Sequence, residues 1–274
     1  MNQSKKTQQF SMREWIWLYG PFIFAGMVFC VCLVIELLRV DLSPEVRSDI
    51  YGIGGSVFYY FSILLCILYG RKYGLNWWRC VIYSLASFLI VFSKVSQTWR
   101  DLDQQLLGAS SVASFRSILL LPVLCFALSG FDSRSTLTLC DYLTPYYFFQ
   151  HGITTNTCWM EGCCAGRPMS WGILSPQTGE IVFPAQPYAV ILALGVSLWG
   201  LLYARKHSYR TNGEVFSGIL IVYGFFRFIM EFFTDDLRVV GPFSLYSFYA
   251  LLLMVMGIGV RWYLRRSVGQ TAVE

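Results

Sequence analysis

Long apolar runs, separated by short polar segments, recur along the whole chain. Most are close to the length that a helix needs to cross the hydrocarbon core of a bilayer. They predict membrane helices at residues 15–38, 52–69, 80–94, 112–130, 140–157, 187–204, 215–233 and 243–261. The third and fifth runs are short or interrupted, which leaves the count open by one. The pattern predicts an all-α polytopic membrane protein with about eight transmembrane helices.

The composition supports a membrane protein. The chain has 274 residues, a mean hydropathy of +0.52, 55% hydrophobic residues and 14% charged residues, which excludes an ordinary soluble domain. The first apolar run is long, and no small-residue cleavage site precedes the acidic turn from Asp41 to Glu45. We therefore expect it to remain as an anchor, whereas a signal peptide would be removed.

The positions of lysine and arginine predict an orientation. Basic residues gather in one alternating set of loops and in the N-terminal tail, for example at Lys5, Arg71, Arg205 and Arg265. The positive-inside rule then places both termini in the cytoplasm. The net charge of +5 reflects this topology and contact with anionic headgroups. No basic patch with interleaved aromatic residues lies outside a membrane flank, so we expect no nucleic-acid partner.

Charged residues inside one apolar run are the strongest functional signal. Tyr223, Arg227, Glu231 and Asp235 are spaced four apart, so at helical pitch they share one stripe of a helix. A charged residue at the bilayer centre costs about 2.5–3.5 kcal/mol, so the stripe should face a protein interior or a watery cavity. The alternative is an Arg–Glu pair that only joins two helices.

The segment after the fifth run is the second candidate for chemistry. Arg167 lies between Gly166 and Pro168, on a stiff turn at the predicted outer face. Arginine there suits a phosphate, which it can grip with two hydrogen bonds, and Gly166 lets the backbone approach closely. The alternative is an interfacial arginine that reaches to the headgroups without a ligand.

Cysteine and histidine near this segment raise the question of a metal. Cys158, Cys163, Cys164 and His151 could supply four ligands, but no Cys-x-x-Cys pair exists and adjacent cysteines chelate one ion poorly. We therefore expect no metal, and a disulfide on the oxidising outer face stays open. His151 is the only imidazole near the predicted outer site, although a histidine at a span end is more often structural.

From about Tyr51 onward, these motifs together resemble the prolipoprotein diacylglyceryl transferase family. The matching segments are Tyr51-Gly52, Cys140-Asp141 to Pro145, Cys158 to Pro168, Phe183 to Tyr188, and Tyr223-Gly-Phe-Phe-Arg227-Phe-Ile-Met-Glu231-Phe-Phe, which Gly213-Glu214 and Ser217-Gly218 precede. The segment from Cys140 resembles the family's Asp-x-x-x-Pro helix start. The resemblance implies a seven-span domain at residues 49–274, with residues 1–48 as a cytoplasmic tail and an extra anchor.

The resemblance implies a lipid transferase of the bacterial cytoplasmic membrane. Such enzymes move the diacylglyceryl group of phosphatidylglycerol onto the lipobox cysteine in the signal peptide of a prolipoprotein. Glycerol phosphate is released, and no metal or organic cofactor takes part. Arg227 and Arg167 would then be the phosphate cations, Glu231 would orient Arg227, and Tyr223 would donate a hydrogen bond.

The chain departs from the family pattern at several positions. Thr155 stands where the family has an arginine, and Phe183 and Ala189 replace the histidine and the glutamate of the Pro-Gln motif. Arg116 stands near the position of another family histidine, and Lys94 replaces a further basic residue. A relocated phospholipid-binding set would comprise Lys94, Arg116, Arg167 and Arg227. His151, one helical turn from Thr155, is then the candidate base.

Three functions remain open. The first is diacylglyceryl transfer or a closely related phospholipid-dependent transfer. The second is a catalytically degenerate relative that binds lipid or lipoprotein. The third is a small transporter whose intramembrane charges line a solute path, although no internal repeat supports it. The charged stripe favours the first, because a scaffold has no physical need for buried charge.

Overall fold

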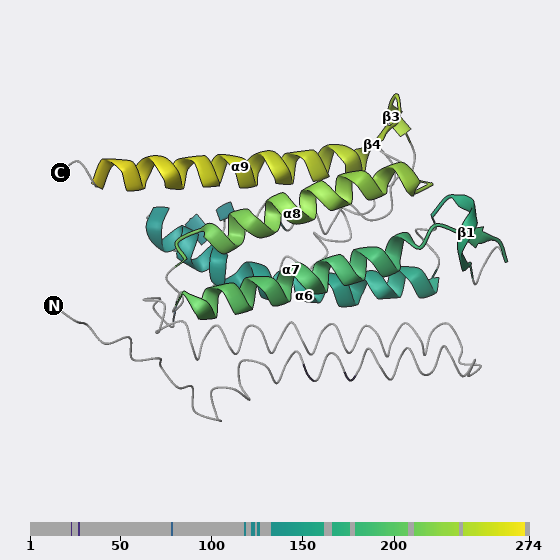
Figure 1. The fold of residues 1–274 in the computed structure, drawn as a ribbon, viewed down its shortest axis with the longest axis horizontal. Coiled ribbons are helices and arrows are strands. Elements are labelled where there is room, and N and C mark those ends of the chain that lie inside the picture. Colours follow the sequence, from purple (N-terminus) through teal and green to yellow (C-terminus); the bar gives the residue numbers. More distant parts are fainter. Residues whose placement is uncertain are drawn as a thin grey trace.

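The described part of the chain is mostly helical. The computed structural model describes residues 133–161, 166–175, 179–207, 211–235 and 238–271, with a few isolated positions before them. Its long helices are α6 (Ser133–Glu161), α7 (Ala185–Lys206), α8 (Glu214–Met230) and α9 (Leu245–Thr271). A 3-10 turn, η2 (Glu231–Phe233), continues α8 directly. The helices lie along one another in a layered bundle (Figure 1).

Four of the predicted membrane runs coincide with these helices. The runs at 140–157, 187–204, 215–233 and 243–261 fall on α6, α7, α8 with η2, and α9. Among the described residues, three stretches are long and apolar enough to cross a membrane, namely Ala185–Ala204, Glu214–Phe233 and Leu245–Arg266. Helix α6 does not meet that criterion, because polar residues such as Asp141 and His151 lower its hydropathy. The four earlier runs lie outside the described residues except for isolated positions, so the count of eight stays a prediction.

Two short antiparallel hairpins add to the all-helical fold that the sequence predicts. Strands β1 (Pro168–Leu174) and β2 (Ile181–Val182) connect α6 to α7. Strands β3 (Arg238–Val240) and β4 (Phe243–Ser244) connect η2 to α9. Both hairpins lie at one end of the bundle, opposite the C-terminus (Figure 1), and we call this end the hairpin end.

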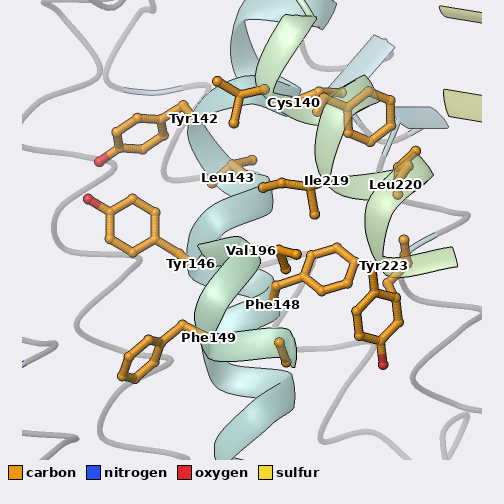
Figure 2. Close-up of a cluster of buried hydrophobic side chains, with 14 of the residues drawn as sticks. Cys140, Tyr142, Leu143, Tyr146, Phe148, Phe149, Val196, Ile219, Leu220 and Tyr223 are labelled. Atoms are coloured by element: carbon orange, nitrogen blue, oxygen red, sulfur yellow. The ribbon is translucent and has the colours of Figure 1, made fainter. Parts of the chain in front are cut away.

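Helix α8 packs at the centre of the described bundle. Figure 2 shows its buried side chains, among them Ile219 and Tyr223, against Leu143 and Phe148 of α6 and Val196 of α7. On the other side, α8 and α9 approach closely where a side chain is missing. A Cβ atom at Gly224 would lie 2.8 Å from the carbonyl oxygen of Ala250. Tight packing of this kind stabilises helix pairs in a bilayer, where the hydrophobic effect between helices is weak.

A buried carboxylate fixes the start of α8. Asp141 accepts hydrogen bonds from Thr211 Oγ1 at 2.6 Å, Gly213 N at 2.6 Å and Phe216 N at 2.7 Å. It thereby satisfies backbone N–H groups that have no partner within the helix. Asp141 lies well inside α6, which begins at Ser133, so the sequence-based expectation of a helix start at this motif is wrong.

Candidate functional site

The predicted stripe on α8 is present over three of its four residues. Tyr223 and Glu231 are fully buried, and the side chain of Arg227 between them is 16% exposed. Asp235 leaves the stripe, because η2 ends at Phe233 and Thr234 adopts an extended backbone with ψ of 155°. Asp235 is exposed, so its expected place on the helical stripe is wrong.

Glu231 is held by several groups around its carboxylate. Its Oε1 lies 2.7 Å from Arg227 Nη2, an ion pair one helical turn apart. Its Oε2 accepts hydrogen bonds from Ser244 Oγ at 2.8 Å and from Thr234 Oγ1 at 3.3 Å. A fully buried carboxylate is costly unless it is paired and hydrogen-bonded, and here both conditions are met. The network fixes the position of the Arg227 guanidinium.

His151 extends the site from α8 onto α6. Its Nε2 lies 2.6 Å from the hydroxyl oxygen of Tyr223, and the direction of the proton depends on the tautomer. The Tyr223 ring packs edge-on against Phe148 with centroids 4.6 Å apart. Figure 2 shows the Tyr223 hydroxyl pointing out of the buried cluster. Tyr223 therefore connects His151 to the helix that carries Arg227.

Arg167 lies beside the end of η2. Its backbone N donates to Phe233 O at 2.9 Å, and its Nε donates to Thr234 O at 3.1 Å. Gly166 and Thr234 form an isolated antiparallel β-bridge. A Cβ atom at Gly166 would collide with the carbonyl oxygen of Phe183. Arg167 as a residue is exposed. Two motifs that are far apart in the sequence thus meet at the hairpin end.

Arg238 is a site residue that the sequence reasoning missed. Its Nη1 donates to Glu231 O at 2.9 Å and to Pro242 O at 3.2 Å, and its Nη2 donates to Thr234 O at 2.6 Å. The guanidinium thereby satisfies carbonyl groups at the end of η2. The only sequence signal was an arginine shortly after the stripe, in a segment that reads as a loop.

Two of the residues that the resemblance marks as departures make local contacts in the structure. Phe183 stacks on Phe233 with ring centroids 4.9 Å apart, so an apolar contact lies where the resemblance implies a histidine. Thr155 donates its hydroxyl to His151 O at 2.7 Å within α6 and brings no charge to the site. Lys94 and Arg116 lie outside the described residues, so their predicted roles stay untested.

The predicted absence of a metal also stays a prediction. Within the part of the chain that the structure describes, no three His, Cys, Asp or Glu side chains gather in a way that could hold an ion. Cys163 and Cys164, which the metal hypothesis would need, are outside that part.

Comparison with known proteins identifies the family of this chain. The family model described as prolipoprotein diacylglyceryl transferase matches residues 10–263. The chain belongs to this family. The match begins ahead of the predicted first span, and the predicted domain boundary at residue 48 stays untested.

Relatives in the prolipoprotein diacylglyceryl transferase family are distant. The chain is 29% identical over 132 residues to phosphatidylglycerol–prolipoprotein diacylglyceryl transferase 2 of Clostridium perfringens, covering 45% of this chain and 51% of that protein. The transferase of Clostridium tetani is 31% identical over 132 residues, covering 45% and 52%. That of Paracidovorax citrulli is 39% identical over 92 residues, covering 32% of each chain. The matched regions span about half or less of these relatives, and no solved structure matches significantly.

Proposed function

We propose that the protein transfers the diacylglyceryl group of phosphatidylglycerol to the lipobox cysteine of a prolipoprotein. One observation carries the proposal: a fully buried Glu231 holds the partly accessible Arg227 within a membrane-length helix. Membership of the family supports this chemistry, and the names of the relatives include both phosphatidylglycerol and prolipoprotein. Burying an ion pair in a bilayer is energetically unfavourable. Its presence in this helix therefore favours a functional role, such as binding an anionic substrate.

The reaction exchanges one bond for another at a single carbon. The cysteine thiolate attacks the glyceryl carbon that is esterified to phosphate, forming a C–S bond. The C–O bond to phosphate breaks, and its electron pair leaves with the oxygen of glycerol phosphate. The thiol proton passes to a base. Negative charge therefore grows on the phosphate during the reaction, which is where a fixed cation accelerates it.

Arg227 and Arg167 are the cations that we assign to the phosphate. Arg227 is oriented by Glu231, and Arg167 is fixed beside Thr234 at the same end of α8. A guanidinium presents planar, paired N–H donors that match phosphate oxygens. Lys94 and Arg116 belong to the same proposed set, together with Gly166 as the point of close backbone approach.

His151 and Tyr223 are the groups that we assign to proton transfer. Tyr223 lies one turn before Arg227, about 6 Å along the helix axis. When the Tyr223 hydroxyl donates to His151 Nε2, the phenol oxygen can take the thiol proton while its own proton moves to the imidazole. This arrangement keeps the proton acceptor one turn away from the cation that binds the leaving group.

The site is proposed to lie at the outer leaflet of the bacterial cytoplasmic membrane, with both termini in the cytoplasm. In that orientation the hairpin end faces outward, where a translocated signal peptide presents its lipobox cysteine. Phosphatidylglycerol would reach the site laterally from the membrane. The distribution of basic residues supports this orientation.

A transfer assay tests the proposal. Protein in nanodiscs that contain phosphatidylglycerol is incubated with a lipobox peptide, and the peptide is analysed by mass spectrometry. We expect a diacylglyceryl mass gain that Arg227→Ala abolishes without loss of membrane insertion. Turnover like that of the wild type in Arg227→Ala would reject the proposal. Binding of phosphatidylglycerol without any transfer by folded protein would instead indicate a degenerate, lipid-binding relative.

A further inference from the structure

Ser244 joins the start of α9 to the carboxylate of Glu231. It directly precedes Leu245, the first residue of α9, and it is fully buried. Ser247 N donates to Ser244 Oγ at 3.2 Å, and Ser244 N donates to Ser247 Oγ at 3.2 Å. This is a reciprocal cap, in which each serine side chain satisfies the backbone N–H of the other. Ser244 Oγ also lies 2.8 Å from Glu231 Oε2.

The inventory of donors fixes the direction of each hydrogen bond. A serine hydroxyl has one proton to donate and two lone pairs, and an ionised carboxylate can only accept. Ser244 must therefore donate its proton to Glu231. Its two lone pairs then accept from Ser247 N and from the Ser247 hydroxyl, whose oxygen is 3.2 Å away. Every hydrogen-bonding capacity of the Ser244 side chain is used.

This bond decides which carboxylate oxygen faces Arg227. The last side-chain torsion angle of a glutamate has a broad distribution. The side chain of Glu231 alone therefore does not fix the plane of its carboxylate. Ser244 and Thr234 hold Oε2, which leaves Oε1 directed at Arg227 Nη2, 2.7 Å away. The hydrogen bond from Ser244 to the ionised carboxylate is charge-assisted, which makes it roughly twice as strong as a neutral one.

We infer that Ser244 is a positioning residue that acts through Glu231 to hold the Arg227 guanidinium in place for an anionic phospholipid. The inference rests on the proposed function for the ligand of Arg227. It adds that Ser244, the residue directly before α9, sets the orientation of the cation on α8.

The experiment uses matched serine variants of the full chain. Ser244→Ala removes the bond to Glu231 and the cap bond that Ser247 N donates, whereas Ser247→Ala removes only its own half of the cap, including the bond that Ser244 N donates. Ser244→Thr keeps the hydroxyl. If Ser244→Ala does not fold, Ser244→Gly replaces it, because glycine is tolerated at the position before a helix. Each variant is assayed for transfer to a lipobox peptide and, by native mass spectrometry, for retention of phosphatidylglycerol, with Arg227→Ala as the reference.

We expect Ser244→Ala to lower kcat/KM for phosphatidylglycerol about tenfold or more and to retain as little lipid as Arg227→Ala. Ser247→Ala should stay within about twofold of the wild type, and Ser244→Thr should recover most of the loss. Wild-type protein that retains lipid but transfers nothing would reject the proposed transfer, and lipid retention would still test Ser244. Equal retention by the wild type and Ser244→Ala, or equal losses in Ser244→Ala and Ser247→Ala, would overturn the inference.

Discussion

Arg227 and Glu231 form an ion pair in which each charge lowers the free-energy cost of burying the other in a membrane helix. Glu231 is fully buried, and the side chain of Arg227 is 16% exposed. Removing one member of such a pair leaves the other as an uncompensated charge, which costs more than the pair contributes. The pair should therefore be sensitive to neutralisation of either residue.

Glu231→Gln tests this pairing. We expect a loss of about 3 kcal/mol in the free energy of unfolding, because Arg227 loses its counter-charge. The loss is measured by denaturation in mixed micelles. Asp235→Asn is the matched control, because Asp235 continues the sequence spacing of the stripe but is exposed. It should change stability by less than about 0.5 kcal/mol, and similar losses in both variants would contradict the account.

Tyr223→Phe tests the assignment of proton transfer. It removes the hydroxyl that contacts His151, so we expect transfer to fall about 100-fold, which the initial rate of peptide modification measures. Tyr203→Phe is the control, because it also removes a tyrosine hydrogen bond, to Glu214 at 2.6 Å, but far from the hairpin end. Equal rates in the two variants would argue against a role for Tyr223 in the chemistry.

Residue spacing predicted part of the site and could not predict the rest. The stripe of Tyr223, Arg227 and Glu231 follows from helical periodicity alone. The contact between Arg167 and Thr234 could not be predicted, because it depends on how the chain returns after α7. Arg238 was missed for the same reason, since its carbonyl partners are defined only by the path of the backbone after η2.

At the scale of elements, glycines determine how closely α8 and α9 pack. A Cβ atom at Gly257 would lie 2.8 Å from Ile221 Cγ1 and 2.9 Å from Ser217 O. Gly259 lies two residues further along α9, and a Cβ atom there would meet nothing within 4 Å. Alanine substitutions at the two positions therefore distinguish the effect of helix packing on stability from the effect of helix propensity.

Gly257→Ala should lower the free energy of unfolding by about 1–3 kcal/mol, because the added methyl group forces the helices apart. Gly259→Ala should leave stability unchanged or raise it by up to about 1 kcal/mol, because alanine is the better helix former. Denaturation of both variants in the same detergent gives the comparison. Equal destabilisation would mean that the close approach of α8 and α9 does not limit stability.

Elements were predictable where hydrophobicity is sustained and unpredictable where it is brief. The runs behind α7, α8 and α9 are long and apolar, so their length alone indicates helices. Strands β2 and β4 have two residues each, too few to show the alternation that identifies a strand. Helix α6 extends beyond its predicted run at both ends, because its polar residues conceal its periodicity.

At the scale of the whole molecule, the orientation in the membrane decides which substrates can reach the site. The two ends of α7 provide exposed positions for a test, Ser170 in the preceding hairpin and His207 after the helix. We expect a cysteine at Ser170 to react with a membrane-impermeant maleimide in intact cells, above the background of unmodified protein. A cysteine at His207 should react only after permeabilisation. The opposite pattern would place the hairpin end in the cytoplasm and exclude a translocated acceptor.

The central claim is that a carbon–sulfur bond forms as glycerol phosphate leaves, with Arg227 holding the phosphate. The most direct measurement uses phosphatidylglycerol with a deuterated diacylglyceryl group and follows the lipobox peptide by mass spectrometry and the phosphate by ³¹P NMR. The account predicts a deuterated mass gain on the cysteine, an equal amount of glycerol phosphate, and neither product with Arg227→Ala. Folded wild-type protein that retains phosphatidylglycerol yet yields neither product would contradict it.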